Sequence, residues 1–276
     1  MESDADRYAV VGNPVAHSLS PRIHSEFARQ CAQNLEYEAI ELPVDGFIDG
    51  VADLRRRGYR GLNVTVPFKR EAWESCDQLS ERAATAGAVN TLIFDEDGGV
   101  HGDNTDGIGL VRDLVDNLQI KIEGSELLIL GAGGAVRGVL EPLLAQSPAG
   151  LTIVNRNLDR AAGLSRDFRS FGKIDVLAYT QLSNQKYDLI INATAAGLSQ
   201  QLPPIPASLL DPATVCYDMM YNVKEPTRFV EWSTSQGVRN SFDGLGMLVE
   251  QAAEAFSLWR GIRPQTGELM RTLRIA

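Results

Sequence analysis

Short runs of apolar and β-branched residues recur along the chain, separated by stretches in which apolar residues return every three or four positions. The first pattern is typical of buried strands and the second of amphipathic helices. Strands are predicted at residues 8–11, 37–42, 61–66, 89–94, 126–130, 151–154, 187–191 and 214–217. Because strands and helices alternate almost throughout, the pattern predicts an α/β protein with mainly parallel sheets.

The second half of the chain repeats this alternation most regularly, and this regularity predicts a nucleotide-binding unit. A final long helix follows, and its apolar face carries Leu245, Leu248, Ala252, Phe256 and Trp259. The pattern alone does not decide on which domain this helix packs.

A glycine turn joins the apolar strand at 126–130 to a helix. Gly131 allows a tight turn, Gly133 lets backbone amides approach a pyrophosphate, and the helix N-terminus faces the anion. The third glycine of the usual dinucleotide fingerprint is replaced by Val136, so the motif is a variant. A strand-to-helix turn of another α/β fold is the alternative interpretation.

The end of the next strand indicates which dinucleotide is preferred. NAD enzymes place a carboxylate there to bind the ribose 2′-hydroxyl, whereas this chain has Asn155, Arg156 and Asn157. A guanidinium group binds a 2′-phosphate, and Arg160 is near enough in sequence to assist. The pattern favours NADP, the alternative being two arginines on a solvated helix start.

Two features of the first half suggest chemistry. Ser18 and Ser20 precede a predicted helix with Pro21 at its first position, so Ser20 suits the N-cap and the two hydroxyls suit a carboxylate. A second helix is expected near Pro67, with Lys69 in its first turn, where a cation is disfavoured. Plain capping and an exposed surface lysine are the structural alternatives.

Composition removes several function classes. Of 276 residues, 26 are Lys or Arg and 36 are Asp or Glu, so the net charge of −10 argues against nucleic acid as a partner. No apolar run reaches a membrane span and the N-terminus does not resemble a signal peptide, so a cytoplasmic protein is expected. Three scattered cysteines indicate neither disulfides nor a metal site, and the histidines are expected at the surface or in caps.

An ordered set of motifs between residues 8 and 259 resembles the shikimate dehydrogenase family. The set consists of Ser18-Leu19-Ser20-Pro21, Asn63-Val64-Thr65-Val66-Pro67-Phe68-Lys69, Gly87-Ala88-Val89-Asn90-Thr91, Asn104-Thr105-Asp106-Gly107, Gly131-Ala132-Gly133-Gly134-Ala135, Asn155-Arg156, Asn192-Ala193-Thr194, Tyr217-Asp218-Met219-Met220-Tyr221 and Asp243-Gly244-Leu245-Gly246-Met247-Leu248. The resemblance implies NADPH-dependent reduction of 3-dehydroshikimate to shikimate in the pathway to chorismate and the aromatic amino acids.

The resemblance also implies residue roles. Lys69 and Asp106 would form the catalytic pair, and the substrate would be bound by Ser18, Ser20, Asn63, Thr65, Asn90, Tyr221 and Gln251 together with that pair. NADP would be bound by Gly131, Ala132, Gly133, Gly134, Ala135, Asn155, Arg156, Asn157, Arg160, Met219 and Gly244, with a weak contact at Glu81. Asn157 stands where many NADP-using members have Thr.

The implied architecture has two α/β domains. Residues 1–106 and 241–276 would form a discontinuous substrate-binding and catalytic domain, and residues 107–240 a Rossmann-type NADP-binding domain. The expected partner is a small-molecule substrate, without nucleic acid or membrane, in a monomer or homodimer. Two alternatives remain open, namely a quinate/shikimate dehydrogenase that prefers NAD and a non-catalytic regulator that senses a ligand on the same fold.

Overall fold

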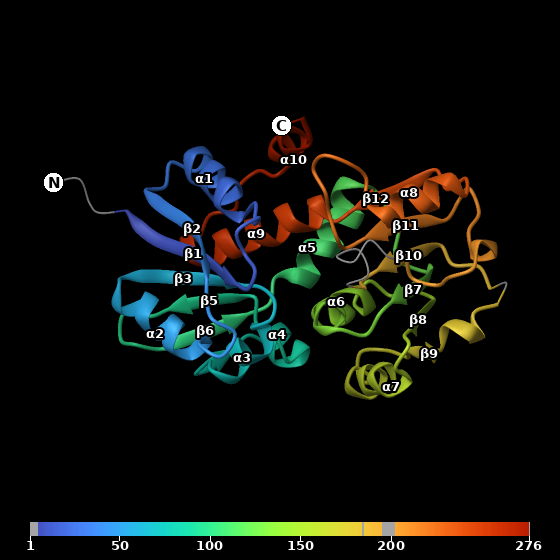
Figure 1. Cartoon of the computed structure of the whole chain (residues 1–276), viewed down its shortest axis with the longest axis horizontal. Helices are drawn as coiled ribbons and strands as arrows, with labels where there is room; N and C mark the ends of the chain where they lie inside the picture. Colours follow the sequence, from blue (N-terminus) through green and yellow to red (C-terminus); the bar gives the residue numbers. More distant parts are fainter. Residues whose placement is uncertain (1–4, 184, 195–201, 276) are drawn as a thin grey trace. The chain divides into compact units, whose positions relative to one another are not determined.

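The computed structural model describes residues 5–183, 185–194 and 202–275, and the chain divides into two compact units (Figure 1). Unit 1 comprises Met1–Gly109 and Val249–Arg271, and unit 2 comprises Leu110–Leu248 and Thr272–Ala276. The divisions fall inside three helices, α5 (Asp106–Arg112), α9 (Leu245–Arg260) and α10 (Gly267–Ile275). Each unit has its own sheet and core.

The sheet of unit 1 has six strands in the order β2-β1-β3-β5-β6-β4. The pairs β1–β2, β1–β3 and β4–β6 are parallel, whereas β3–β5 and β5–β6 are antiparallel. The strands are β1 (Asp6–Gly12), β2 (Leu35–Glu41), β3 (Tyr59–Val64), β4 (Gln78–Leu79), β5 (Thr91–Phe94) and β6 (Val100–Asp103).

Successive side chains of β1 lie on opposite faces of this sheet, because side chains alternate along a strand with a period of two. Ala9 and Val11 join a core with α2 and α3, whereas Tyr8 and Val10 pack on the opposite face, where the aromatic residues of α1 and α9 lie. The helices entirely within unit 1 are α1 (Ser20–Gln30), α2 (Phe47–Arg56), α3 (Lys69–Glu74) and α4 (Glu81–Ala86).

Unit 2 has a fully parallel sheet in the order β12-β11-β10-β7-β8-β9. The strand order reverses between β7 and β10, and ligands of open α/β sheets bind at the carboxyl ends of strands beside such a reversal. The strands are β7 (Glu126–Leu130), β8 (Gly150–Val154), β9 (Asp175–Leu177), β10 (Leu189–Asn192), β11 (Val215–Asp218) and β12 (Asn240–Asp243).

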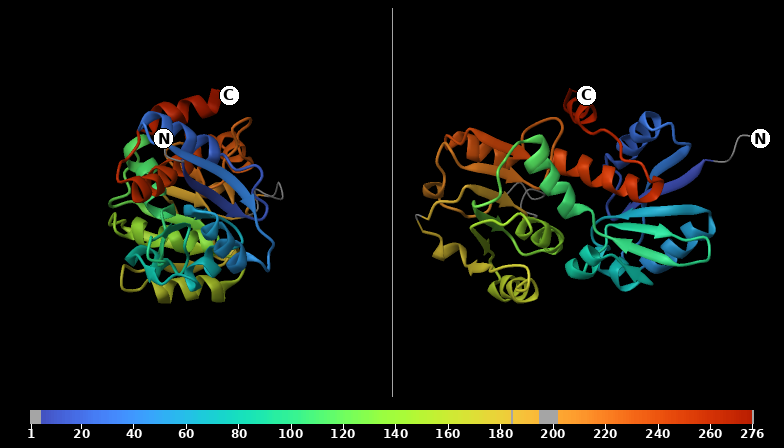
Figure 2. Two further views of the ribbon diagram at one scale, coloured as in Figure 1. Left: turned by 90° about the vertical axis from the view of Figure 1, so that its left-hand side faces the viewer. Right: turned by 180° about the vertical axis from the view of Figure 1, so that it is seen from behind.

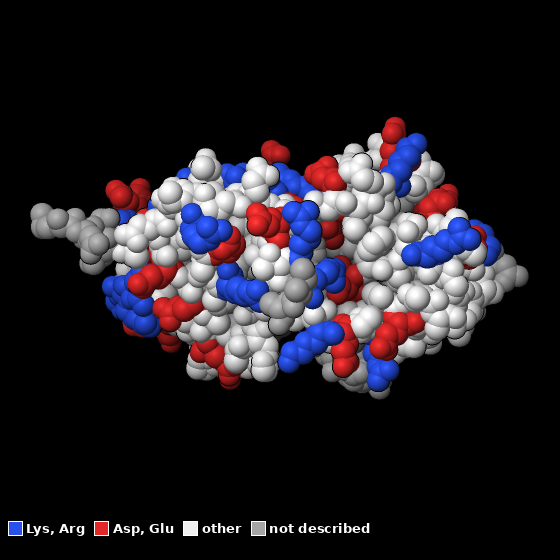
Figure 3. Space-filling model, turned by 90° about the horizontal axis from the view of Figure 1, so that it is seen from above, with Lys and Arg blue, Asp and Glu red and all other residues white. Residues whose placement is uncertain are grey.

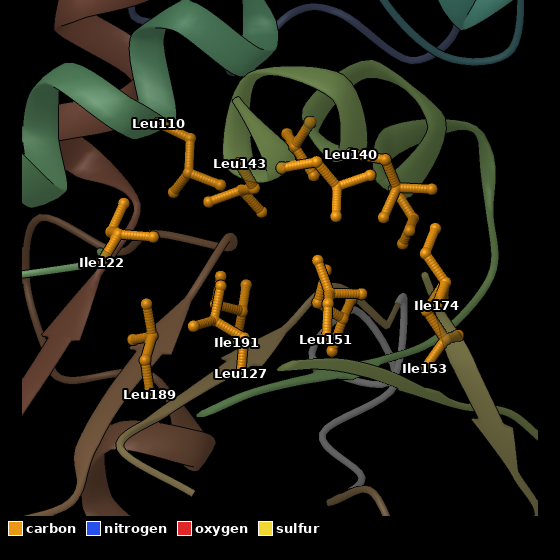
Figure 4. Close-up of a cluster of buried hydrophobic side chains, with 14 of the residues drawn as sticks. Leu110, Ile122, Leu127, Leu140, Leu143, Leu151, Ile153, Ile174, Leu189 and Ile191 are labelled. Atoms are coloured by element: carbon orange, nitrogen blue, oxygen red, sulfur yellow. The ribbon is translucent and has the colours of Figure 1, made fainter. Parts of the chain in front are cut away.

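Helices cover both faces of this sheet (Figure 1 and Figure 2). On one face, Leu140 and Leu143 of α6 (Gly134–Leu144) and Leu110 meet side chains of β7, β8 and β10 (Figure 4). This core also includes residues of α7 (Leu158–Asp167), while α8 (Arg228–Ser235) packs on the opposite face. The remaining elements are a π-helical turn (Asp113–Asn117), two 3₁₀ turns (Tyr179–Gln181 and Ala207–Leu209) and α10 (Gly267–Ile275).

Two local predictions are wrong. The N-cap of α1 is Leu19, so Ser20 and Pro21 occupy the first two helical positions, and the Ser18 hydroxyl oxygen accepts from the Ser20 amide at 3.2 Å. His24, expected at the surface or in a cap, is fully buried because it lies on the side of α1 that packs against β2.

The distribution of surface charge and the length of the helices can be compared with what nucleic acids and membranes require. On the face drawn in Figure 3, basic and acidic side chains are interspersed and form no broad area of one sign. Within the described ranges, no helix has the length and apolar character needed to cross a membrane.

Candidate active site

Lys69 and Asp106 form an ion pair in unit 1, with 2.6 Å between Lys69 Nζ and Asp106 Oδ2. Lys69 begins α3 directly after the loop that follows β3, and Asp106 begins α5. The two side chains are only 22% and 10% exposed. A lysine in the first turn of this helix was predicted from the sequence, and the nearby carboxylate supplies the stabilisation that the helix N-terminus does not give a cation.

The carboxylate of Asp106 is held on both oxygens. Asn90 Nδ2 donates to Asp106 Oδ1 at 2.8 Å, while Lys69 binds the other oxygen. The Asp106 backbone amide donates to Asn104 Oδ1 at 3.1 Å, and Asn104 Nδ2 donates to the carbonyl of Ala88 at 3.0 Å. The loop before α5 therefore fixes the position of the carboxylate, and this in turn orients the ammonium group.

Amide and hydroxyl side chains surround this pair. Gln251 Oε1, from α9, lies 3.4 Å from Asn90 Nδ2 and 3.3 Å from the Thr105 hydroxyl. Asn63, at the end of β3, donates from Nδ2 to Thr91 Oγ1 and to the carbonyl of Asn90, both at 3.2 Å. The structure thus connects Lys69, Asp106, Asn90, Gln251 and Asn63 within unit 1, a set suited to a polyhydroxy ligand.

The two predicted serines lie at the start of α1, and Thr65 follows β3. Ser20 is buried and Ser18 and Thr65 are partly exposed. None of the hydrogen bonds described for unit 1 joins these three side chains directly to the Lys69–Asp106 pair. Tyr221, the other predicted substrate residue, belongs to unit 2 and lies three residues after β11.

The glycine turn follows β7, as predicted, and its geometry suits a pyrophosphate. Gly131 has φ +112°, and a Cβ there would lie 3.2 Å from the carbonyl oxygen of Ala193. A Cβ at Gly133 or Gly134 would meet nothing within 4 Å, and no side chain caps the N-terminus of α6. The first amides of α6 are accordingly accessible to an anion. Val136 is completely buried in the core, which explains the departure at the third glycine.

The turn after β8 carries the predicted phosphate residues. Asn157 caps α7, because its Oδ1 accepts from the Arg160 amide at 3.1 Å, and its carbonyl accepts from Asn155 Nδ2 at 2.8 Å. The Arg156 and Arg160 side chains are exposed, and no ion pair in the described part of the chain involves them. Two guanidinium groups are therefore available to a phosphate.

Met219 and Gly244 meet at the same edge of the unit 2 sheet, beyond β11 and β12. The Met219 amide donates to the Asn192 carbonyl at 2.9 Å, and a Cβ at Gly244 would lie 2.5 Å from the Met219 oxygen. Only glycine fits there. Burial also raises the pKa of the neighbouring Asp218 to about 6. Glu81 is different, since it begins α4 in unit 1, whereas the other predicted cofactor residues belong to unit 2.

Several residues that hold the site were not predicted individually. Arg82 binds both oxygens of Asp103, at 2.6 and 2.8 Å, and Arg82 also pairs with Glu254 of α9 at 3.1 Å. Asp103 in turn accepts from the Asn104 amide. The only available signal was the polar run 103–106 before a predicted helix, which marks a structured loop without revealing its distant partner.

Comparison with known proteins gives consistent matches along the chain. The family model for the shikimate dehydrogenase substrate binding domain matches residues 10–92, the model for shikimate / quinate 5-dehydrogenase matches residues 113–200, and the model for the shikimate 5'-dehydrogenase C-terminal domain matches residues 244–274. The shikimate dehydrogenase (NADP(+)) of Thioalkalivibrio sulfidiphilus is 54% identical over 269 residues, which is 98% of each chain.

Solved structures agree with this. An Ael1 enzyme from Pseudomonas putida is 44% identical, with a TM-score of 0.92 and 99% of each chain covered. Shikimate 5-dehydrogenase from Thermus thermophilus, solved in complex with NADP(H) and shikimate, is 33% identical, with a TM-score of 0.84 over 98% of this chain and 99% of that chain. With high identity along nearly the whole length and matching models on both units, the chain belongs to the shikimate dehydrogenase family.

Proposed function

We propose that this chain catalyses the reversible, NADPH-dependent reduction of 3-dehydroshikimate to shikimate, with Lys69 and Asp106 as its catalytic pair. Membership of the family and the names of its NADP(+)-dependent relatives support the reaction and the cofactor. The observation that carries the residue assignment is the largely buried Lys69–Asp106 pair, set among Asn90, Gln251 and Asn63.

Lys69 is the group that stabilises charge and transfers the proton. Bound NADPH supplies the hydride. Reduction of a ketone leaves negative charge on its oxygen, and an ammonium group at hydrogen-bonding distance stabilises that charge and delivers a proton to it. Asp106 orients the ammonium through Oδ2, and the bond from Asn90 to Oδ1 keeps the carboxylate in place.

The remaining polar residues have binding roles in this proposal. Ser18, Ser20 and Tyr221 hold the substrate carboxylate, while Asn63, Thr65, Asn90 and Gln251 bind its hydroxyl groups. A polyol acid requires such donors and acceptors, because every hydroxyl removed from water needs a new partner.

The second unit binds the cofactor in this proposal. The uncapped start of α6 and the open space at Gly133 suit a pyrophosphate, with Ala132, Gly134 and Ala135 completing the turn. Arg156, Arg160, Asn155 and Asn157 bind the 2′-phosphate, and Met219 and Gly244 line the nicotinamide. We also retain Glu81 of unit 1 as a weak cofactor contact, for which neither its position at the start of α4 nor its charge gives a physical argument.

Finer features also belong to this proposal. The functional domains are residues 1–106 with 241–276 and residues 107–240, and the enzyme acts in the cytoplasm as a monomer or homodimer. Sedimentation of the purified protein distinguishes the two oligomeric states.

The decisive experiment is the measurement of kcat/KM for shikimate and quinate, each with NADP and with NAD. The pair of shikimate and NADP should give the highest value by at least tenfold. Highest values with quinate or with NAD would favour the quinate/shikimate dehydrogenase alternative. Absence of turnover in all four combinations would favour a ligand-sensing regulator.

A further inference from the structure

A tyrosine that has no assigned role lies beneath the proposed substrate residues of unit 1. Tyr37, in β2, is 8% exposed, and its ring stacks on that of His24 with 4.1 Å between the centroids and 4° between the planes. Phe27, Phe256 and Trp259 complete the aromatic surroundings of His24. Packing alone would be served by phenylalanine, and a buried phenol hydroxyl is costly unless it is hydrogen bonded.

The hydroxyl of Tyr37 is bonded to a proposed substrate residue. It donates to Asn63 Oδ1 at 2.7 Å, and this bond is buried. Both protons of the Asn63 amide are used elsewhere, in the bonds to Asn90 and Thr91. Asn63 is therefore held in one orientation, in which only Oδ1 has a free lone pair, so the residue offers the ligand an acceptor rather than a donor.

The Tyr37 hydroxyl stays protonated, so it is able to act as the donor of this bond. Burial raises the pKa of Tyr37 well above its usual value, and a hydrogen bond from the Ser20 side chain lowers it in part. A phenol has one proton. The geometry assigns that proton to the bond with Asn63 Oδ1. The stack of His24 on Tyr37 packs α1 against β2 and so holds the phenol beside Asn63.

We propose that Tyr37 is a positioning residue for the substrate, which fixes Asn63 as an acceptor for a ligand hydroxyl. This inference rests on the proposed function, in which Ser20 and Asn63 contact the substrate. It adds a residue that touches neither ligand.

The test replaces Tyr37 by phenylalanine, which preserves the stack on His24 and removes only the hydroxyl. The matched control is Tyr8→Phe, since Tyr8 is the partner of Tyr37 in the β1–β2 register and its hydroxyl contacts Arg260. The dissociation constants of shikimate and NADP are measured by calorimetry, together with KM and kcat.

Tyr37→Phe should weaken shikimate binding and raise its KM about fivefold to tenfold, the effect of one lost hydrogen bond. The kcat at saturation should change less than twofold, the affinity for NADP should be unchanged, and Tyr8→Phe should behave as the wild type. Unchanged shikimate binding in Tyr37→Phe, or an equal loss in Tyr8→Phe, would overturn the inference.

A double-mutant cycle asks whether Tyr37 acts through Asn63. In an Asn63→Ala background, Tyr37→Phe should weaken shikimate binding less than twofold, because the residue that it positions has been removed. A full fivefold to tenfold loss in that background contradicts the proposed route. Wild-type turnover tests the proposed function separately. If the wild type turns over and the variants bind normally, only the inference fails.

Discussion

At the scale of single residues, Lys69 shows how a position that is unfavourable by itself is stabilised by a specific partner. A cation at the first position of a helix loses about 0.3 to 1 kcal/mol to the helix dipole. Asp106 compensates at 2.6 Å, in a site where little water screens the pair. The ammonium group of Lys69 therefore does not stabilise α3, and its partner Asp106 offsets the cost of placing a cation at the start of this helix.

Removal of the Lys69 ammonium group should abolish most of the catalytic activity and leave the affinity for NADP unchanged. Lys69→Ala is expected to lower kcat about 10²- to 10⁴-fold, the range for loss of a positioned proton donor. The dissociation constant of NADP should be unchanged, because the proposed cofactor residues belong almost entirely to unit 2. Steady-state kinetics and calorimetry measure the two quantities.

Lys173→Ala is the matched control, since Lys173 forms an exposed ion pair with Asp175 in unit 2. It should leave kcat within twofold of the wild type. Near-normal turnover of Lys69→Ala would exclude Lys69 as the catalytic acid.

The exposed guanidinium groups of Arg156, just before α7, and of Arg160, within α7, allow a second test at this scale. Arg156→Ala should raise the KM for NADP about 10- to 100-fold, because charged hydrogen bonds to a phosphate contribute about 1.5 to 3 kcal/mol. The KM for NAD should change less than threefold, since NAD lacks the 2′-phosphate. Arg169→Ala, an exposed arginine after α7, is the control. Equal increases for both cofactors would show that Arg156 does not contact the 2′-phosphate.

At the scale of elements, the glycine turn contains two glycines that are required for different reasons. Gly131 has a positive φ and faces the Ala193 carbonyl, so its need is internal to the fold. Gly133 has an ordinary φ and open space around its would-be Cβ, so nothing in unit 2 itself requires glycine there. Under the proposed function, the need for Gly133 would come from a pyrophosphate that approaches the backbone.

These two positions should separate stability from binding. Gly131→Ala is expected to lower the free energy of unfolding by about 1 to 3 kcal/mol, the cost of a strained backbone. Gly133→Ala should leave the melting temperature nearly unchanged and weaken NADP binding about tenfold or more, because a methyl group would meet the pyrophosphate. Thermal unfolding without ligand and calorimetry with NADP provide the measurements. Normal NADP affinity in Gly133→Ala would argue against a pyrophosphate at this turn.

The elements also show what a sequence pattern can predict. The buried strands β7 and β8 were predicted almost to the residue, because a short, continuous apolar run that ends at a turn is typical of a strand buried on both faces. The strands β4, β6, β9 and β12 were missed. They have two to four residues each, and most of those residues are only half-buried or exposed, so they lack the periodicity that identifies a strand.

The candidate site was predictable to a similar degree. Lys69 and Asp106 were named from motifs 37 positions apart, and the structure brings them together. Arg82 and Tyr37 could not be found in this way, because their importance lies in contacts with distant partners rather than in a local pattern. Ser20 was placed one position wrongly, because Ser18 supplies the acceptor that a capping serine would have supplied. The roles of the site residues stay predictions.

At the scale of the whole molecule, one buried histidine should make the free energy of unfolding decrease as the pH falls. His24 is completely buried, and neither ring nitrogen has a hydrogen-bond partner of good geometry among the described residues. Burial lowers the pKa of His24 from its usual 6.5 to about 3, and the Asn63 side chain opposes this shift only in part. The ring is therefore neutral in the folded state at any pH near neutrality.

The sign of the effect follows from proton uptake. Below pH 6.5 the unfolded chain binds a proton at His24 that the folded chain does not, so the contribution of His24 is fully present above pH 6.5 and is lost as the pH falls toward 3. Between about pH 7.5 and 4.5 this loss is about 2 to 3 kcal/mol. Denaturant unfolding in this range should show a smaller loss of stability in His24→Leu than in the wild type.

His101→Phe is the control, because His101 lies partly exposed beside Asp95. Its stability should fall with pH as that of the wild type does, apart from the contribution of that surface pair. An unchanged pH dependence in His24→Leu would mean that His24 is protonated in the folded protein.

The main segment of unit 2, Leu110–Leu248, is inserted into the chain of unit 1, and this order has a consequence for synthesis. The ring of Trp259 of α9 lies tilted against that of Tyr8, with 4.6 Å between the ring centroids, and Trp259 Nε1 donates to the Leu92 carbonyl in β5. On the ribosome, β1 and β5 are synthesised first, and they lack their α9 partner Trp259 until Leu110–Leu248 has been translated. At roughly 5 to 20 residues per second that delay is about 7 to 30 seconds. During this interval the uninterrupted middle segment has all of its sheet available, so the later half of the chain is positioned to fold before the earlier half is complete.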